Sequence, residues 1–117
     1  MNARRTVLIV EDDEDLRRMY RHVLMIAGYD VRDASNGRSA LLQIDVEPPD
    51  VLVLDLFLPG ITGLEVVQDI ASHVYTAHIP IVIVTGSAMN LDHLDVACVL
   101  RKPVTGDELL RAVARAS

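Results

Sequence analysis

The feature that most constrains the fold of this chain is a regular alternation of short apolar runs with longer amphipathic stretches. The runs are rich in β-branched residues and almost wholly apolar, which is typical of strands covered on both faces. They lie at residues 6–10, 31–34, 51–54, 79–84 and 98–100. Strict alternation of strands and helices predicts an α/β fold, in which a parallel sheet lies between two layers of helices.

Helical periodicity fills the stretches between the runs. After the first run, one apolar face recurs at the spacing of a buried helix side. Its members are Leu16, Met19, Tyr20, Val23, Leu24 and Ala27. Gly28 supplies a C-terminal stop for this helix, and a second helix is predicted over residues 38–44.

Two further helices begin at a threonine followed three residues later by a glutamate, which is the spacing of a capping box. These pairs are Thr62 with Glu65 and Thr105 with Glu108. Both helices are expected to pack one apolar stripe against the sheet. The stripes comprise Leu64, Val67, Ile70, Ala71 and Val74 in one helix, and Leu109, Ala112, Val113 and Ala116 in the other.

Composition and charge limit the class of protein. Half of the residues are hydrophobic, which indicates a packed globule, and the length fits one domain over residues 1–117. The formal net charge of −6 disfavours direct binding of nucleic acid. The first apolar run is too short for a signal peptide or a membrane span. The lone Cys98 excludes an internal disulfide and fits a reducing compartment, so a cytoplasmic protein without membrane insertion is expected.

Polar side chains follow four of the predicted strands, at the end where a parallel sheet gathers its functional groups. They are Glu11 and Asp12 after the first run, Asp55 after the third, Thr85 after the fourth and Lys102 after the fifth. Each residue alone has an ordinary explanation as a cap, a turn or a surface residue. Their joint occurrence at one edge of the sheet predicts a functional site.

Three of these residues are carboxylates, which repel one another unless protons or a cation relieve the charge. Oxygen ligands suit a hard divalent cation that retains water, and Mg²⁺ is expected. The acids at residues 13–15 are more simply explained as solvated residues at a helix N-terminus. A metal-bound carboxylate such as Asp55 can attack phosphorus, while Lys102 and Thr85 can contact the phosphoryl oxygens.

The sequence resembles the receiver domain of bacterial two-component response regulators in four segments. They read TVLIVEDDEDLR, DVLVLDLFLPGITGLEV, IPIVIVTGSA and VLRKPVTGDELL. The resemblance spans essentially the whole chain. It implies a doubly wound, flavodoxin-like sheet of five parallel strands in the order 2-1-3-4-5.

By this resemblance, Asp55 is the phosphoacceptor and also a metal ligand. Glu11 and Asp12 are the acidic pair, with Asp12 the more direct ligand of Mg²⁺, and Phe57 lends its backbone carbonyl to the metal. A bulky Phe57 side chain could also shield an acyl phosphate from water.

The resemblance also implies how the site is switched and supplied. Thr85 would be the switch hydroxyl and Lys102 the phosphoryl-contacting lysine, with a cis bond between Lys102 and Pro103. A histidine kinase or phosphotransfer protein would donate the phosphoryl group, and a protein target would respond to it. Activity would be limited to self-catalysed transfer and slow autodephosphorylation, so a conventional enzyme is not expected. Both a monomer and a homodimer stay open.

Two departures from the family concern the output of the signal. Val99 occupies the position, three residues before Lys102, where the family usually has a tyrosine or phenylalanine that moves with Thr85. Only residues 90–96 remain for the fourth helix, about two turns, which predicts a shortened helix or an irregular loop. One hypothesis is that the output uses another surface, such as the first helix.

Two other functions are alternatives to a phosphorylated receiver. One is a receiver-like protein-binding module that is never phosphorylated, which Val99 and the short fourth helix favour modestly. The other is a phosphohydrolase of the haloacid dehalogenase type, which needs a second acid two positions after its nucleophilic aspartate. Phe57 stands at that position, and the chain lacks room for a substrate cap.

Overall fold

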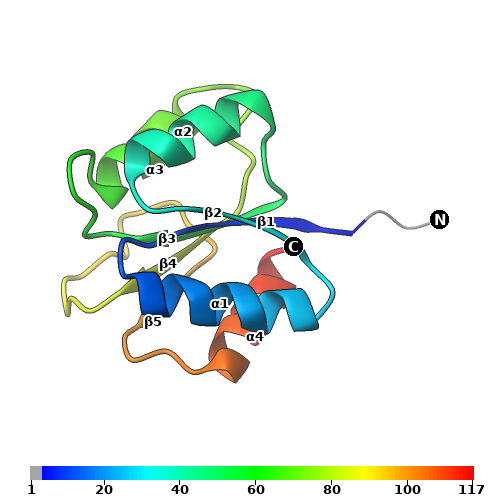
Figure 1. The fold of residues 1–117 in the computed structure, drawn as a ribbon. Coiled ribbons are helices and arrows are strands. Elements are labelled where there is room, and N and C mark those ends of the chain that lie inside the picture. Colours follow the sequence, from blue (N-terminus) through cyan, green and yellow to red (C-terminus); the bar gives the residue numbers. More distant parts are fainter. Residues whose placement is uncertain (1–3) are drawn as a thin grey trace.

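The computed structural model describes residues 4–117 as alternating strands and helices. The strands are β1 (Thr6–Val10), β2 (Asp30–Ala34), β3 (Val51–Asp55), β4 (Ile81–Thr85) and β5 (Cys98–Arg101). The helices are α1 (Glu14–Ile26), α2 (Gly37–Val46), α3 (Gly63–Ala71) and α4 (Gly106–Ala116) (Figure 1). The five predicted strands are all present; β1 has the expected ends, and the ends of the others differ from those expected by at most two residues.

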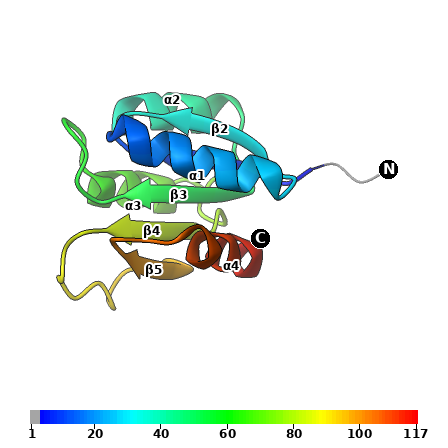
Figure 2. The same cartoon turned by 60° about the horizontal axis from the view of Figure 1, so that its bottom comes forward.

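The strands form one parallel sheet in the order β2-β1-β3-β4-β5. Figure 2 shows β2, β3, β4 and β5 following one another in this order. Helices α1 and α4 cover one face of the sheet, and α2 and α3 cover the other (Figure 1). The predicted doubly wound α/β fold and its strand order are therefore confirmed. No helix within residues 4–117 is long and apolar enough to cross a membrane.

Two apolar clusters, one on each face of the sheet, account for the composition of the central strands. Along β1, Val7 and Ile9 pack on the side of α1 and α4, whereas Leu8 and Val10 pack on the side of α2 and α3. Successive strand residues point to opposite faces, and both faces are covered. The central strands consequently need apolar residues at nearly every position.

Local capping sets where the helices begin. Asp13, Asn36 and Thr62 each accept a hydrogen bond from the backbone N–H three residues later, at the starts of α1, α2 and α3. Thr105 and Glu108 complete a reciprocal capping box at the start of α4, as predicted. Gly28, with φ of 99°, follows the end of α1 in a conformation that glycine adopts easily.

The predicted stripe of the third helix is partly wrong. Helix α3 ends at Ala71, and Val74 lies beyond it with 84% of its surface exposed. Val66, which the stripe omitted, is fully buried instead. The helix is shorter than the apolar pattern suggested because the Thr76 hydroxyl donates to the Ile70 carbonyl and draws the chain into a turn.

The residues between β4 and β5 form an irregular loop and turns, so the shortened fourth helix is wrong and the alternative of a loop is right. The Asn90 side chain accepts from the backbone N–H of Asp92, a local bond that competes with helix formation. Leu91 is buried in the cluster on the α2 and α3 face, where Leu94 and Val96 also pack. The loop thus covers the part of the sheet that a fourth helix was expected to cover.

Gly63 supports the backbone of the site, because a methyl group at its Cα would lie 2.5 Å from the Leu56 Cα and would also overlap the Asp55 carbonyl oxygen. We expect Gly63→Ala to lower the free energy of unfolding by about 1–3 kcal/mol, since backbone atoms must shift to make room. Urea denaturation measures this change. Gly86→Ala is the matched control, because a Cβ there meets no atom within 4 Å. Equal stability of the two variants would contradict the prediction.

Candidate functional site

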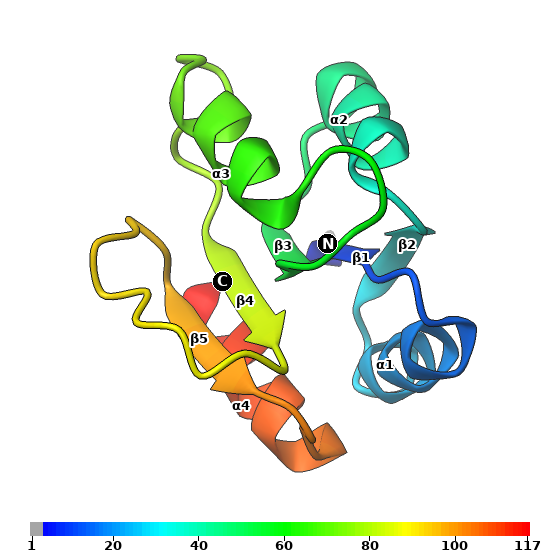
Figure 3. The ribbon, with the colours of Figure 1, turned by 90° about the vertical axis from the view of Figure 1, so that its left-hand side faces the viewer.

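The polar residues singled out in the sequence lie at one edge of the sheet, where the parallel strands end. Figure 3 looks onto this edge. Glu11 and Asp12 follow β1, Asp55 ends β3, Thr85 ends β4, and Lys102 follows β5. Because β1, β3 and β4 are neighbours in the sheet, the fold brings Glu11, Asp55 and Thr85 together from distant parts of the chain.

The Lys102 ammonium joins two of the carboxylates. Its Nζ donates to Glu11 Oε1 at 2.8 Å and to Asp55 Oδ2 at 3.1 Å. The acids are almost fully buried, with 1% of Glu11 and 5% of Asp55 exposed. Removing one partner from such a buried arrangement leaves a charge without compensation, which is strongly destabilising.

Backbone N–H groups hold the other oxygens of these two carboxylates. Glu11 Oε2 accepts from the Asp13 N–H at 3.2 Å, and Asp55 Oδ1 accepts from the Phe57 N–H at 3.1 Å. Each carboxylate is therefore held at both oxygens, which fixes its orientation.

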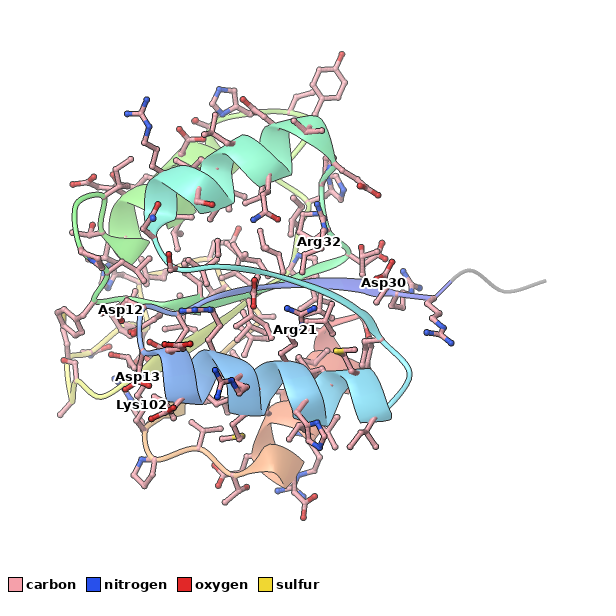
Figure 4. The ribbon with its side chains drawn as sticks, in the orientation of Figure 1. Asp12, Asp13, Arg21, Asp30, Arg32 and Lys102 are labelled. Carbon is pink, nitrogen blue, oxygen red and sulfur yellow. The ribbon has the colours of Figure 1, made fainter. Side chains whose placement is uncertain are left out.

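Asp12 is exposed but completes an acidic group with Glu11 and Asp55, in which one carboxylate oxygen of each residue lies within 4.8 Å of the other two. Figure 4 shows Asp12, Asp13 and Lys102 at this same edge of the molecule. Three oxygen donors of this kind, two of them buried, fit a hard divalent cation such as Mg²⁺. An exposed Asp12 leaves room for water on the metal.

Burial and charge shift two pKa values in the site. Burial raises the pKa of Glu11 to about 7, although the hydrogen bond from Lys102 acts in the opposite direction. Burial alone would lower the pKa of Lys102, but its hydrogen bonds to Glu11 and Asp55 outweigh burial and raise it. The site therefore holds a firmly charged ammonium beside an acid that takes up a proton easily when no metal is bound.

Thr85 is fully buried and does not hydrogen-bond to Asp55. Its Oγ1 accepts from the Ser87 N–H at 3.1 Å, and its carbonyl oxygen accepts from the Lys102 N–H at 2.8 Å. The Lys102–Pro103 peptide bond is cis, as expected. Val99 is half-buried on β5 and packs against the cluster on the α2 and α3 face.

Two arginines that were not among the predicted site residues also contact the site. Arg17 donates from Nη1 to the carbonyl oxygen of Glu11 at 3.0 Å. Arg101 donates to two carbonyl oxygens in the loop after Thr85. Their positions next to the acidic run and to Lys102 were the available signal, but arginines on a helix surface or at a strand end are commonly just solvated.

The comparison with known families shows which family the chain belongs to. The model of the response regulator receiver domain matches residues 7–114. This chain belongs to that family. Receiver domains of two-component response regulators act as phosphorylation-dependent signalling switches and work with histidine kinases or phosphotransfer proteins.

Individual relatives agree with this assignment. The polar-differentiation response regulator DivK of Brucella anthropi is 34% identical over 88 residues, which cover 75% of this chain and 72% of DivK. The uncharacterized transcriptional regulatory protein YrkP of Bacillus subtilis is 37% identical over 86 residues, 74% of this chain but 36% of YrkP. The structure of the Vibrio cholerae chemotaxis protein CheY4 superposes with a TM-score of 0.91 at 29% identity, covering 98% of this chain and 100% of CheY4. The chain spans about a third of the length of several of its curated relatives.

The raised pKa of Glu11 predicts a pH-dependent stability in metal-free protein. Between the ordinary value of 4.5 and about 7, the folded state binds more protons at Glu11 than the unfolded state does. The contribution of Glu11 to the free energy of unfolding therefore falls as the pH rises through this window. Urea denaturation in EDTA should show that Glu11→Gln removes this contribution, whereas Glu14→Gln, at an exposed position, retains it. Parallel profiles for wild type and Glu11→Gln would contradict the prediction.

Proposed function

We propose that this chain is a phosphorylation-dependent switch that accepts a phosphoryl group on Asp55 with the aid of Mg²⁺. A phosphohistidine of a histidine kinase or phosphotransfer protein is the donor. The observation that carries the proposal is the buried Asp55 carboxylate, which is paired with Lys102 beside the acids Glu11 and Asp12. Residues 1–117 act as one receiver domain in the cytoplasm, and a protein target responds to the phosphorylated form.

In the transfer, an Asp55 oxygen attacks the phosphorus atom while the bond from phosphorus to the donor imidazole nitrogen breaks. The electron pair of that bond stays on the imidazole, which takes up a proton from water. The Lys102 ammonium lies 3.1 Å from Asp55 Oδ2, so its positive charge is already placed beside the attacking carboxylate. The transfer needs positioning and positive charge around the phosphoryl oxygens more than covalent chemistry from the protein.

Glu11, Asp12 and Asp55 would hold Mg²⁺, and the carbonyl oxygen of Phe57 would complete the protein ligands. The bound metal would supply positive charge to the phosphoryl oxygens. Lys102 would exchange its contact with Asp55 for one with a phosphoryl oxygen, because an ammonium on a flexible stem can redirect its donors. The Thr85 hydroxyl would donate to another phosphoryl oxygen. A binding module that is never phosphorylated would need none of these properties.

The decisive experiment is the intact mass of the protein after incubation with a small phosphodonor. We expect wild type to gain one phosphoryl group in Mg²⁺ and none in EDTA, and Asp55→Asn to gain none under either condition. Asp107→Asn, in the first turn of α4, is the matched control and should behave as wild type. A folded wild-type protein that gains no mass, even in short incubations, would replace this proposal with the unphosphorylated binding module.

Phe57 is expected to slow hydrolysis of the aspartyl phosphate. Its backbone N–H donates to Asp55 Oδ1, and its apolar side chain, two residues from Asp55, has 59% of its surface exposed. Phe57→Asn should speed the loss of the phosphoryl group, because a polar side chain can hold water near the acyl phosphate. The decay of the mass adduct after removal of the donor measures this rate. An unchanged half-life would show that Phe57 does not shield the site.

A further inference from the structure

Arg101 connects the end of β5 to the loop that follows β4. Its Nη1 donates to the Ser87 carbonyl oxygen at 2.6 Å, and its Nη2 donates to the Met89 carbonyl oxygen at 2.9 Å. A planar guanidinium that uses two nitrogens on two acceptors fixes direction as well as distance. Arg101 thereby holds residues 87–89 in one arrangement relative to β5.

The same short segment also holds the Thr85 hydroxyl. The Ser87 N–H donates to Thr85 Oγ1 at 3.1 Å, and Ser87 Oγ accepts from the Met89 N–H at 3.0 Å. Thr85 and Arg101 are opposite each other in the β4–β5 register. These hydrogen bonds link Thr85 through Ser87 and Met89 to Arg101, and we call this linked set the circuit.

This circuit supplies contacts that a helix after β4 or an aromatic ring at residue 99 would otherwise provide. Residues 86–97 contain no helix, so helical hydrogen bonds do not occupy the carbonyl groups of Ser87 and Met89. Val99 has no ring and no polar atom with which to follow Thr85, and it packs into the apolar cluster. The hydrogen bonds of Arg101 therefore connect the loop after β4, in which Ser87 contacts Thr85, to β5, which is followed by Lys102.

We propose that Arg101 is a positioning residue for phosphoryl transfer to Asp55, and that it acts by orienting Thr85 through Ser87 and Met89. The inference rests on the proposed function, because it assigns Thr85 a contact with the phosphoryl group. When Thr85 turns towards that group, Ser87 follows, and the contact of Arg101 with the loop changes. Arg101 itself touches neither Asp55 nor the incoming phosphoryl group.

The test is a double-mutant cycle on the rate of phosphoryl-adduct formation with a small phosphodonor and Mg²⁺. Arg101→Gln should slow the wild-type rate by about threefold or more, which is the scale expected for losing one solvent-exposed hydrogen bond of modest net strength. In a Thr85→Val background it should have no further effect. In a Thr85→Ser background, which keeps the hydroxyl, the effect of Arg101→Gln should persist. Arg101→Lys should recover part of the rate, because one ammonium can serve only one of the two carbonyls well.

Arg111→Gln is the matched control, since Arg111 is an exposed arginine on α4, outside this circuit. It should leave the rate as in wild type. An equal slowing by Arg101→Gln in the wild-type and Thr85→Val backgrounds would overturn the inference, and so would no slowing at all. Thermal unfolding of each variant establishes that the compared proteins are folded.

Amide hydrogen exchange separates this inference from the proposed function. In unphosphorylated protein, Arg101→Gln should speed exchange at residues 87–89, and Arg111→Gln should not. Unchanged exchange overturns the role of Arg101 even if wild type is phosphorylated normally. If wild type forms no adduct on Asp55, the proposed function fails first and the positioning role falls with it, whatever the exchange data show.

Discussion

The ammonium of Lys102 offsets the repulsion between the carboxylates that make up the site. Two nearly buried carboxylates, Glu11 and Asp55, share this one cation, and Asp12 adds a third acid within ligand distance. Lys102 is the only lysine in the sequence, and the hydrogen bond from its backbone N–H to Thr85 places it at the sheet edge. The parallel order of the strands is what makes this contact available, because β1, β3 and β5 all end at that edge.

Much of this arrangement could be predicted because it depends on periodicity and on strand direction. Short apolar runs that alternate with amphipathic stretches are typical of parallel strands between helix layers, and parallel strands place the residues that follow them at one edge. That reasoning alone predicts that Glu11, Asp55 and Lys102 lie together at one edge of the sheet. Capping residues such as Thr105 were equally predictable, because the residues that their hydrogen bonds join lie within four positions of each other in the sequence.

The parts that the sequence did not predict depend on contacts between distant residues or on competition between local ones. Val74 continues the helical spacing, yet Thr76 turns the chain before that position can be buried. Arg101 looks like a solvated strand-end residue until the loop from residue 86 to 97 is seen to fold back against it. Residues 90–96 left room for a helix of about two turns, but the Asn90 side chain accepts from the Asp92 N–H and forms a local turn there instead.

The absence of a helix between β4 and β5 also bears on where a signal could leave the domain. Helix α1 is held to the rest of the molecule by Arg17 and Arg21, which both approach Asp33 of β2, and by its packing against α4. The loop at residues 86–97 is instead held largely by side chains, including Arg101, Ser87 and Asn90. Few backbone hydrogen bonds would have to break for this loop to rearrange, which is typical of segments that open at low free-energy cost. A change at Thr85 therefore reaches this loop directly, through the Ser87 N–H that donates to Thr85 Oγ1.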